Sequence, residues 1–197
     1  MIPTARRAAR EESPLSVPSE PAGPGPAEGA RPIRPSARVP IASWRDRIRA
    51  RTGVEEVITF HVGSERFATA LGAIEEAIEY PDVHRVPEMP ETMLGVFSLR
   101  GRLVPLCSPV RALGVALGVA EPTVLLLRSE TRRVGVAVDD VDDVMTLDLA
   151  AVRPAPGIDD PDGVLLGVVR QGDLLLAIVD PEAMLGACLT TRVLEAM

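Results

Sequence analysis

From residue 57 onward, apolar and polar side chains alternate along much of the chain. Ile58, Phe60 and Val62 are the apolar positions of the first run, Gly63-Ser64 interrupts it, and the alternation resumes at Phe67. Successive side chains of a strand point to opposite faces of a sheet, so alternation broken by a glycine-containing turn is typical of a β-hairpin. This segment is therefore predicted to form a hairpin.

The same pattern predicts three further hairpins. Two of them have short turns at Arg100-Gly101 and Gln171-Gly172, and the third has a longer connection through residues 129–132. The paired segments are 96–99 with 103–106, 124–127 with 134–138, and 165–169 with 174–179. None of the connections carries the helical pattern that a βαβ unit needs, so the sequence predicts an all-β barrel or a pair of barrels.

Helices are expected only as minor elements. Short helices are predicted near 90–94 and 109–113, and a C-terminal helix is predicted from Pro181, which suits a first helical turn, to about Leu194. The apolar stretch 74–78 fits a helix face or a strand, and its brevity favours the strand.

The N-terminal region differs in composition from the remainder of the chain. Nine of the 19 prolines lie in the first 40 residues, among Gly, Ala, Ser and Arg. Such a segment cannot bury enough apolar surface to offset its ordering entropy. The sequence therefore predicts a disordered Pro/Ala/Arg-rich tail over residues 1–52 and one domain over residues 53–197.

The tail is predicted to end in a short basic helix over 44–51, with Ser43 as its N-cap and Trp44 and Ile48 four positions apart. Two interpretations remain open. The helix either leads into the domain or serves as a basic anchor for an acidic partner or a membrane surface.

Charge and composition exclude several classes of function. Every basic residue among the 21 is arginine, so amine chemistry such as a Walker A loop or a Schiff base is excluded. Residues 53–197 carry eleven arginines and twenty-three acids, a net charge of −12, and only 3% of the chain is aromatic. An acidic domain with few stacking side chains is unsuited to nucleic acid.

The residues that could bind a metal are few and far apart. They are His61, His84, Cys107 and Cys188, which share no ligand spacing, and the two cysteines are expected to be buried or half-buried thiols. The acidic run 139–143 lacks the order of a calcium loop and is interpreted as a solvated turn between strands. No metal and no cofactor are expected.

No catalytic motif is present either. The chain has no Gly-x-Ser-x-Gly elbow and no nucleophile beside either histidine. A pair of carboxylates such as Glu75 and Glu76 could act as acid and base in any fold, but nothing in the pattern distinguishes that pair from others. An interaction module is favoured by elimination, and no apolar run reaches the length of a membrane span.

One segment resembles a known family. Residues 95–105 read Gly-Val-Phe-Ser-Leu-Arg-Gly-Arg-Leu-Val-Pro, which is similar to the Gly-Val-x-Asn-Leu-Arg-Gly-x-x-x-Pro motif of the CheW-like chemotaxis coupling proteins. Segments 60–67, 74–76, 86–87, 134–141, 152–156 and 172–180 resemble family segments in the same order, so the likeness covers about residues 55–187.

The resemblance implies two small five-stranded SH3-like barrels that share one core. It also implies a non-enzymatic adaptor that couples the cytoplasmic tip of methyl-accepting chemotaxis receptors to the regulatory domain of a CheA-type histidine kinase. The expected location is the cytoplasm, at receptor arrays on the inner face of the membrane, with no direct insertion into it.

Some positions match those with which the family contacts its partners. Arg100 and Gly101 are the clearest match, since a hairpin tip projects its arginine into solvent. An acidic and an apolar residue on one strand, and two apolar residues on another, are also expected to contact receptor or kinase. These predicted partner-binding residues are Ile74, Glu76, Arg100, Gly101, Val124 and Leu125.

Two segments depart from the family pattern. Ser98 replaces the asparagine of the motif, and 107–110 replaces an apolar-acidic-leucine run. These departures leave open an alternative, a divergent auxiliary CheW-like protein that binds a receptor or another partner without building a full kinase complex.

Overall fold

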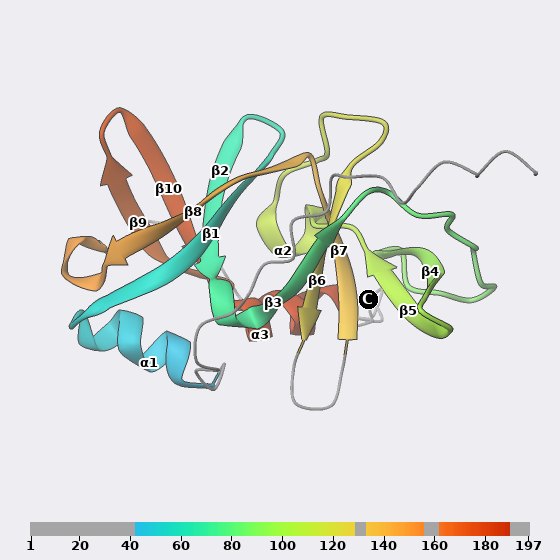
Figure 1. The fold of residues 1–197 in the computed structure, drawn as a ribbon, viewed down its shortest axis with the longest axis horizontal. Coiled ribbons are helices and arrows are strands. Elements are labelled where there is room, and N and C mark those ends of the chain that lie inside the picture. Colours follow the sequence, from blue (N-terminus) through green and yellow to red (C-terminus); the bar gives the residue numbers. More distant parts are fainter. Residues whose placement is uncertain (1–41, 129–132, 156–161, 190–197) are drawn as a thin grey trace, which may run out of the picture.

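The computed structural model describes residues 42–128, 133–155 and 162–189. Strands dominate these residues (Figure 1). The strands are β1 (Val54–Val62), β2 (Glu65–Ala70), β3 (Ile74–Ile78), β4 (Met93–Leu99), β5 (Arg102–Cys107), β6 (Thr123–Arg128), β7 (Arg133–Val138), β8 (Asp140–Asp148), β9 (Leu165–Gln171) and β10 (Leu174–Val179). The helices are α1 (Ala42–Ala50), α2 (Val110–Leu113) and α3 (Pro181–Leu189), with 3₁₀ turns η1 (Leu71–Ala73) and η2 (Leu149–Ala151).

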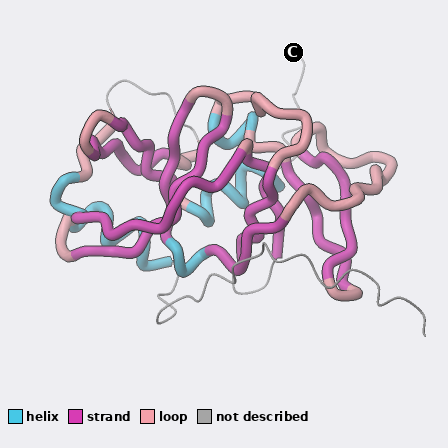
Figure 2. Tube along the Cα trace, turned by 45° about the horizontal axis from the view of Figure 1, so that its top comes forward, coloured by secondary structure: helices cyan, strands magenta, loops and turns pink. Residues whose placement is uncertain are grey.

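The strands form two five-stranded sheets that lie side by side (Figures 1 and 2). One sheet has the order β8-β1-β2-β10-β9 and the other β3-β6-β7-β5-β4. All four predicted hairpins are present, as β1–β2, β4–β5, β6–β7 and β9–β10. The predicted all-β architecture of two SH3-like barrels is therefore confirmed.

Three groups of buried side chains hold the barrels. One group draws on both sheets, for example Phe60 and Phe67 from one sheet and Leu125 and Val136 from the other, together with Met184 of α3. The remaining two groups each fill a single barrel. The shared core predicted from the resemblance is confirmed.

The two barrels are built from two interleaved repeats. The first repeat is β1–β5 and the second is β6–β10, and the two sheet orders become identical when each strand is replaced by its equivalent in the other repeat. The first barrel contains β3, β4 and β5 of the first repeat with β6 and β7 of the second. The second barrel contains β8, β9 and β10 of the second repeat with β1 and β2 of the first. The hairpins β4–β5 and β9–β10 show the correspondence closely. His84 bridges Val96 of β4 just as Arg153 bridges Val168 of β9.

Short connections enforce this exchange of strands. Only Asp139 lies between β7 and β8. One residue is too short for the two-residue turn that would pair β8 antiparallel to β7, and far too short for the crossover of about a dozen residues that a parallel neighbour needs. The chain therefore passes at Asp139 from one sheet to the other, where β8 pairs with β1. The buried Asp139 carboxylate accepts hydrogen bonds from the Gly63 amide at 2.6 Å and the Gly118 amide at 2.8 Å.

Helix α1 is an integral part of the second barrel. Trp44 and Ile48 are buried in the core of that barrel, and the Trp44 indole Nε1 donates a hydrogen bond to the Val179 carbonyl at 3.1 Å. The folded unit thus includes α1, which lies before the predicted boundary at residue 53; residues 1–41 of the predicted tail lie outside the described residues. Ser43 lies inside the helix, so its predicted place as the N-cap is wrong.

Other local predictions have mixed outcomes. Residues 74–78 form strand β3 and α2 covers 110–113, as expected, while α3 follows the prediction from Pro181 to Leu189, beyond which the chain lies outside the described residues. The helix predicted at 90–94 is absent, because Met93 already pairs with Cys107 in the β4–β5 ladder.

The acidic run at 139–143 is a strand where a solvated turn was predicted. Residues 140–148 form β8, which pairs with β1 and so belongs to the sheet. Six of its nine side chains are exposed, so the acids line the outer face of an edge strand. Aspartates favour turns, but they can also occupy a strand when one face of that strand remains in contact with water.

Both cysteines are buried, as predicted, and they meet in the shared core. The Cys107 thiol lies 4.0 Å from the Cys188 carbonyl, and the Cys188 thiol lies 3.8 Å from the Ser108 carbonyl. A hydrogen bond with Cys107, together with burial, raises the pKa of the Cys188 thiol well above its ordinary value. The Cys188 thiol therefore stays protonated, and the two cysteines pack in the core between β5 and α3.

Candidate partner-binding site

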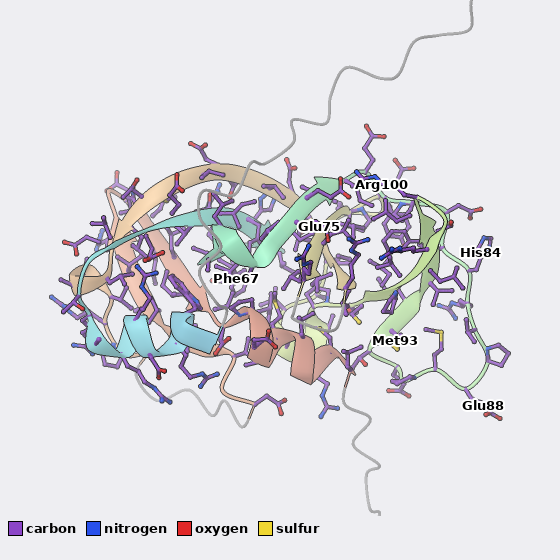
Figure 3. All side chains as sticks on the ribbon, turned by 60° about the horizontal axis from the view of Figure 1, so that its bottom comes forward. Phe67, Glu75, His84, Glu88, Met93 and Arg100 are labelled. Atoms are coloured by element: carbon purple, nitrogen blue, oxygen red, sulfur yellow. The ribbon has the colours of Figure 1, made fainter. Side chains whose placement is uncertain are left out.

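Arg100 occupies the tip of the β4–β5 hairpin. The two-residue turn has positive φ at both positions, 49° at Arg100 and 77° at Gly101. Such a turn matches the twist of its flanking strands and favours glycine, so Gly101 fits its place while Arg100 is held in an uncommon conformation. The turn projects the Arg100 side chain outward, with 69% of it exposed (Figure 3).

The Arg100 guanidinium forms an ion pair with Glu76 of β3. Nη2 of Arg100 lies 2.7 Å from Oε2 of Glu76, whose side chain is only 19% exposed. Strands β3 and β4 are the two edges of their sheet, so this pair links them. The structure therefore brings together Glu76, Arg100 and Gly101, three of the predicted partner-binding residues.

The two partners of this ion pair differ in exposure. Arg100 lies mostly in solvent, whereas Glu76 is largely buried and its second oxygen, Oε1, has no hydrogen-bond partner within the described residues. Arg100 therefore supplies the charge that compensates a partly buried carboxylate. The Arg100 N–H groups that do not bond Glu76 remain accessible at the surface.

Glu75 is held by a different arginine, which the sequence analysis did not identify. Nη2 of Arg133 on β7 donates to Oε1 of Glu75 at 2.6 Å. Adjacent acids on β3 thus contact arginines from two different elements, and each carboxylate is engaged in an ion pair. This arrangement offers no paired acid and base, and only the sheet order, which places β6 between β3 and β7, reveals the contact.

The apolar members of the predicted site are in the core. Ile74 is 2% exposed, and Val124 and Leu125 are fully buried. Leu125 belongs to the shared core and Val124 to the core of its own barrel, so both faces of β6 are covered. Their expected role as a direct contact surface is therefore corrected: within this chain their side chains pack internally and support β3.

An exposed apolar residue that the sequence analysis did not select lies beside Arg100. Leu103 of β5 is 74% exposed and faces Ser98 of β4 in the hairpin register. In the predicted alternation it is an outward position, so an apolar residue there is the signal that could have identified it. Arg100 and Leu103 together give the hairpin a cationic and an apolar contact point.

Comparison with known proteins decides the family. The family model described as "CheW-like domain" matches residues 56–188. The chain belongs to the CheW-like family. "Chemotaxis protein CheW" of Klebsiella aerogenes is 30% identical over 146 residues, which cover 72% of this chain and 87% of that protein. "Chemotaxis protein CheW" of Rhizobium meliloti is 33% identical over 110 residues, 54% of this chain and 70% of its own.

A solved structure shows the same CheW-like fold. The crystal structure of the scaffolding protein TtCheW from Thermoanaerobacter tengcongensis aligns with a TM-score of 0.58 at 19% sequence identity. The alignment covers 64% of this chain and 89% of that one. Helix α1 precedes the segment 56–188 that the family model matches. No helix within the described ranges is long and apolar enough to cross a membrane.

The departures from the CheW-like motif have clear local roles. Ser98 is exposed on the outer face of β4, where it changes the surface of the hairpin. Ser108 Oγ accepts a hydrogen bond from the Val110 amide at 3.4 Å at the start of α2. Asp180, its counterpart in the second repeat, accepts from the Glu182 amide at 3.0 Å at the start of α3. The fold therefore accommodates the changed segment 107–110.

Proposed function

We propose that this chain is a non-enzymatic adaptor that couples the cytoplasmic tip of methyl-accepting chemoreceptors to the regulatory domain of a CheA-type histidine kinase. Membership of the CheW-like family and the chemotaxis names of its relatives support this function. The single structural observation that carries it is the Arg100-Gly101 hairpin tip, which matches the family motif and exposes its guanidinium.

Arg100 is proposed as the anchor of the partner interface. Its guanidinium offers five donors in a planar arrangement that suits carboxylates and carbonyl groups. Exposed Leu103 adds apolar area next to it, and Gly101 allows the turn that projects Arg100. Glu76 orients Arg100 through one of its N–H groups, and the remaining N–H groups of the guanidinium are available to a partner.

The buried residues of the predicted site act indirectly in this proposal. Ile74 pairs with Leu127, and β3 continues along β6 past Leu125 and Val124. This packing fixes the strand that presents Glu76. Contacts through one hairpin are modest in area, so firm assembly relies on several such contacts in a receptor array at the cytoplasmic face of the membrane.

Calorimetric titration of the full-length protein against the kinase regulatory domain tests the proposal. We expect the wild-type protein to bind, and Arg100→Ala to weaken binding about tenfold or more, as loss of an arginine anchor does. Arg85→Ala is the matched control, because Arg85 is an exposed arginine that forms no ion pair within the described residues. This control is expected to bind like the wild type.

Absence of binding by the folded wild-type protein would overturn the coupling function. A parallel titration with a receptor cytoplasmic tip then addresses the alternative of a divergent auxiliary protein. The exposed Ser98 beside Leu103 is the observation that favours this alternative, since it alters the hairpin surface itself. Binding to the receptor without binding to the kinase is the result that the auxiliary role requires.

A further inference from the structure

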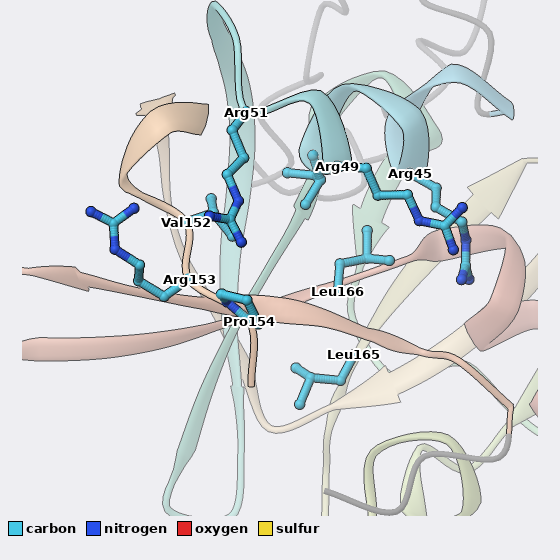
Figure 4. Close-up of a pocket in the computed structure, with 9 residues that line it drawn as sticks. Arg45, Arg49, Arg51, Val152, Arg153, Pro154, Leu165 and Leu166 are labelled. Carbon is cyan, nitrogen blue, oxygen red and sulfur yellow. The ribbon is translucent and has the colours of Figure 1, made fainter. Parts of the chain in front are cut away.

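A hollow of about 300 Å³ lies where α1 meets β9 and the segment after η2 (Figure 4). Four of the side chains that line it are arginines and none is acidic, and the remaining ones are apolar. The lining residues are Arg45, Ile48, Arg49, Arg51, Val152, Arg153, Pro154, Leu165 and Leu166.

The helical spacing of α1 produces this arrangement. Trp44 and Ile48 turn into the barrel, so Arg45 and Arg49, each one position further along, share the flank of the helix beside the buried stripe. The helix ends at Ala50, and Arg51 follows with a φ of 53°. The docking of α1 on the barrel thus places these arginines beside Arg153, which is distant in sequence.

Two of the four arginines are fixed in place by the protein. Arg45 donates through Nε to Asp180 at 2.6 Å and through Nη2 to the Gly163 carbonyl at 2.7 Å. Arg153 donates through Nη1 to the Ala150 carbonyl at 2.8 Å. Side chains held in this way lose little further conformational freedom when a ligand binds.

The other two arginines have no acidic partner within the described ranges. Arg49 and Arg51 are exposed and form no ion pair with any residue that the structure describes. Of the arginines that line the hollow, Arg45 forms an ion pair with Asp180. Neighbouring guanidinium groups repel one another, and this repulsion is relieved by an anion placed between them. The positive charge gathered at this hollow contrasts with the net charge of −7 of the whole chain.

We propose that this hollow binds the phosphate group of a small phosphorylated molecule. Guanidinium groups bind phosphate oxygens through paired, charge-assisted hydrogen bonds, and two or more arginines match a doubly charged phosphate. The apolar lining, with Val152 and Leu166 among it, takes the organic part of the ligand. The volume is near the lower end for ligand pockets, which fits a molecule of nucleotide size or less.

A membrane surface fits the hollow less well. An interfacial helix inserts its apolar face into the lipid. In α1 that face is Trp44 and Ile48, and both are buried in the barrel. The arginines surround a concave site, which suits an enclosed small ligand.

Calorimetric titrations of the full-length protein with inorganic pyrophosphate and with ADP at low ionic strength test the proposal. Both probes are expected to bind, ADP more tightly because its base and ribose contact the apolar lining. The double variant Arg49→Gln/Arg51→Gln is expected to weaken binding tenfold or more. Arg170→Gln, an exposed arginine near the far end of β9, is the matched control and is expected to leave binding unchanged.

Two results would overturn the proposal. The first is that neither probe binds; if the protein then sediments with phosphatidylglycerol vesicles in a manner that depends on Arg49 and Arg51, the arginines are assigned to a membrane. The second is that the double variant binds both probes like the wild type. An unchanged melting temperature of the double variant excludes unfolding as the cause of lost binding.

Discussion

Single residues set the geometry at equivalent places in the two barrels. A Cβ on Gly95 would lie 2.5 Å from Val83 Cγ1 and 2.6 Å from the His84 carbonyl oxygen. A Cβ on Gly167 would lie 2.5 Å from the Arg153 carbonyl oxygen. Each glycine allows a neighbouring segment to bridge the first strand of its hairpin, so the absence of a side chain is a requirement of the backbone contact.

Alanine substitutions at Gly95 and Gly186 should have opposite effects on the free energy of unfolding. Gly95→Ala must move backbone atoms and adopt an unfavourable φ, and we expect the free energy of unfolding to fall by about 2–4 kcal/mol. Gly186→Ala, at an exposed helical position where a Cβ would meet nothing within 4 Å, should raise it by about 0.5–1 kcal/mol. Urea unfolding of both variants provides the measurement, and equal stability of the two would contradict this account.

At the scale of the element, α1 shows how a basic helix can belong to the core. Nine residues are too few for a stable isolated helix, so packing of its apolar stripe supplies most of its stability. The stripe is buried against the second barrel, while the arginines that flank it line the hollow. The two interpretations left open by the sequence are thus not exclusive: the helix is part of the folded unit and still presents a basic surface.

Truncation measures the contribution of α1. Removing residues 1–41 leaves every described core contact in place and should leave the free energy of unfolding unchanged. Removing residues 1–52 also deletes Trp44 and Ile48, and we expect a loss of at least about 3–5 kcal/mol, the typical cost of deleting one large buried aromatic side chain. Thermal and urea unfolding followed by circular dichroism compare the two forms, and similar stabilities would show that α1 does not support the barrel.

At the scale of the whole molecule, the interleaved repeats couple the two barrels. Each barrel contains strands from both halves of the chain, and the shared core lies between them. A hairpin tip at the edge of one barrel is therefore connected through continuous packing to the other barrel. The molecule is expected to unfold as one cooperative unit.

Splitting the chain tests this coupling. Ala120 and Glu121 lie in the exposed connection between the repeats, so a break there leaves the strands intact. We expect neither fragment, 1–120 or 121–197, to form a folded monomer, because each lacks the strands that complete its barrel. An equimolar mixture should regain β structure. Circular dichroism with light scattering provides the measurement, and a folded monomer of either fragment would contradict the interleaved architecture.

Local pattern determined much of this protein. The four hairpins follow from alternation and glycine turns, since strand faces and turn conformations depend on neighbouring residues. The position of Arg100 at a hairpin tip follows from the same signals. Leu-Gly-Val occurs four times in the sequence, at 94–96, 113–115, 117–119 and 166–168, and the first and the last of these lie at equivalent positions of the two repeats.

Only the tertiary structure decided the remainder. Val124, Leu125 and Ile74 are apolar in sequence, and their burial depends on the sheet that covers each face. The aspartates at 140–143 belong to a strand because β1 is available to pair with them. The partners of Glu75 and Glu76, the contact between the cysteines and the arginine hollow all join residues distant in sequence. Local propensity cannot specify such contacts, because they form only when the strands and helices have assembled into the two barrels.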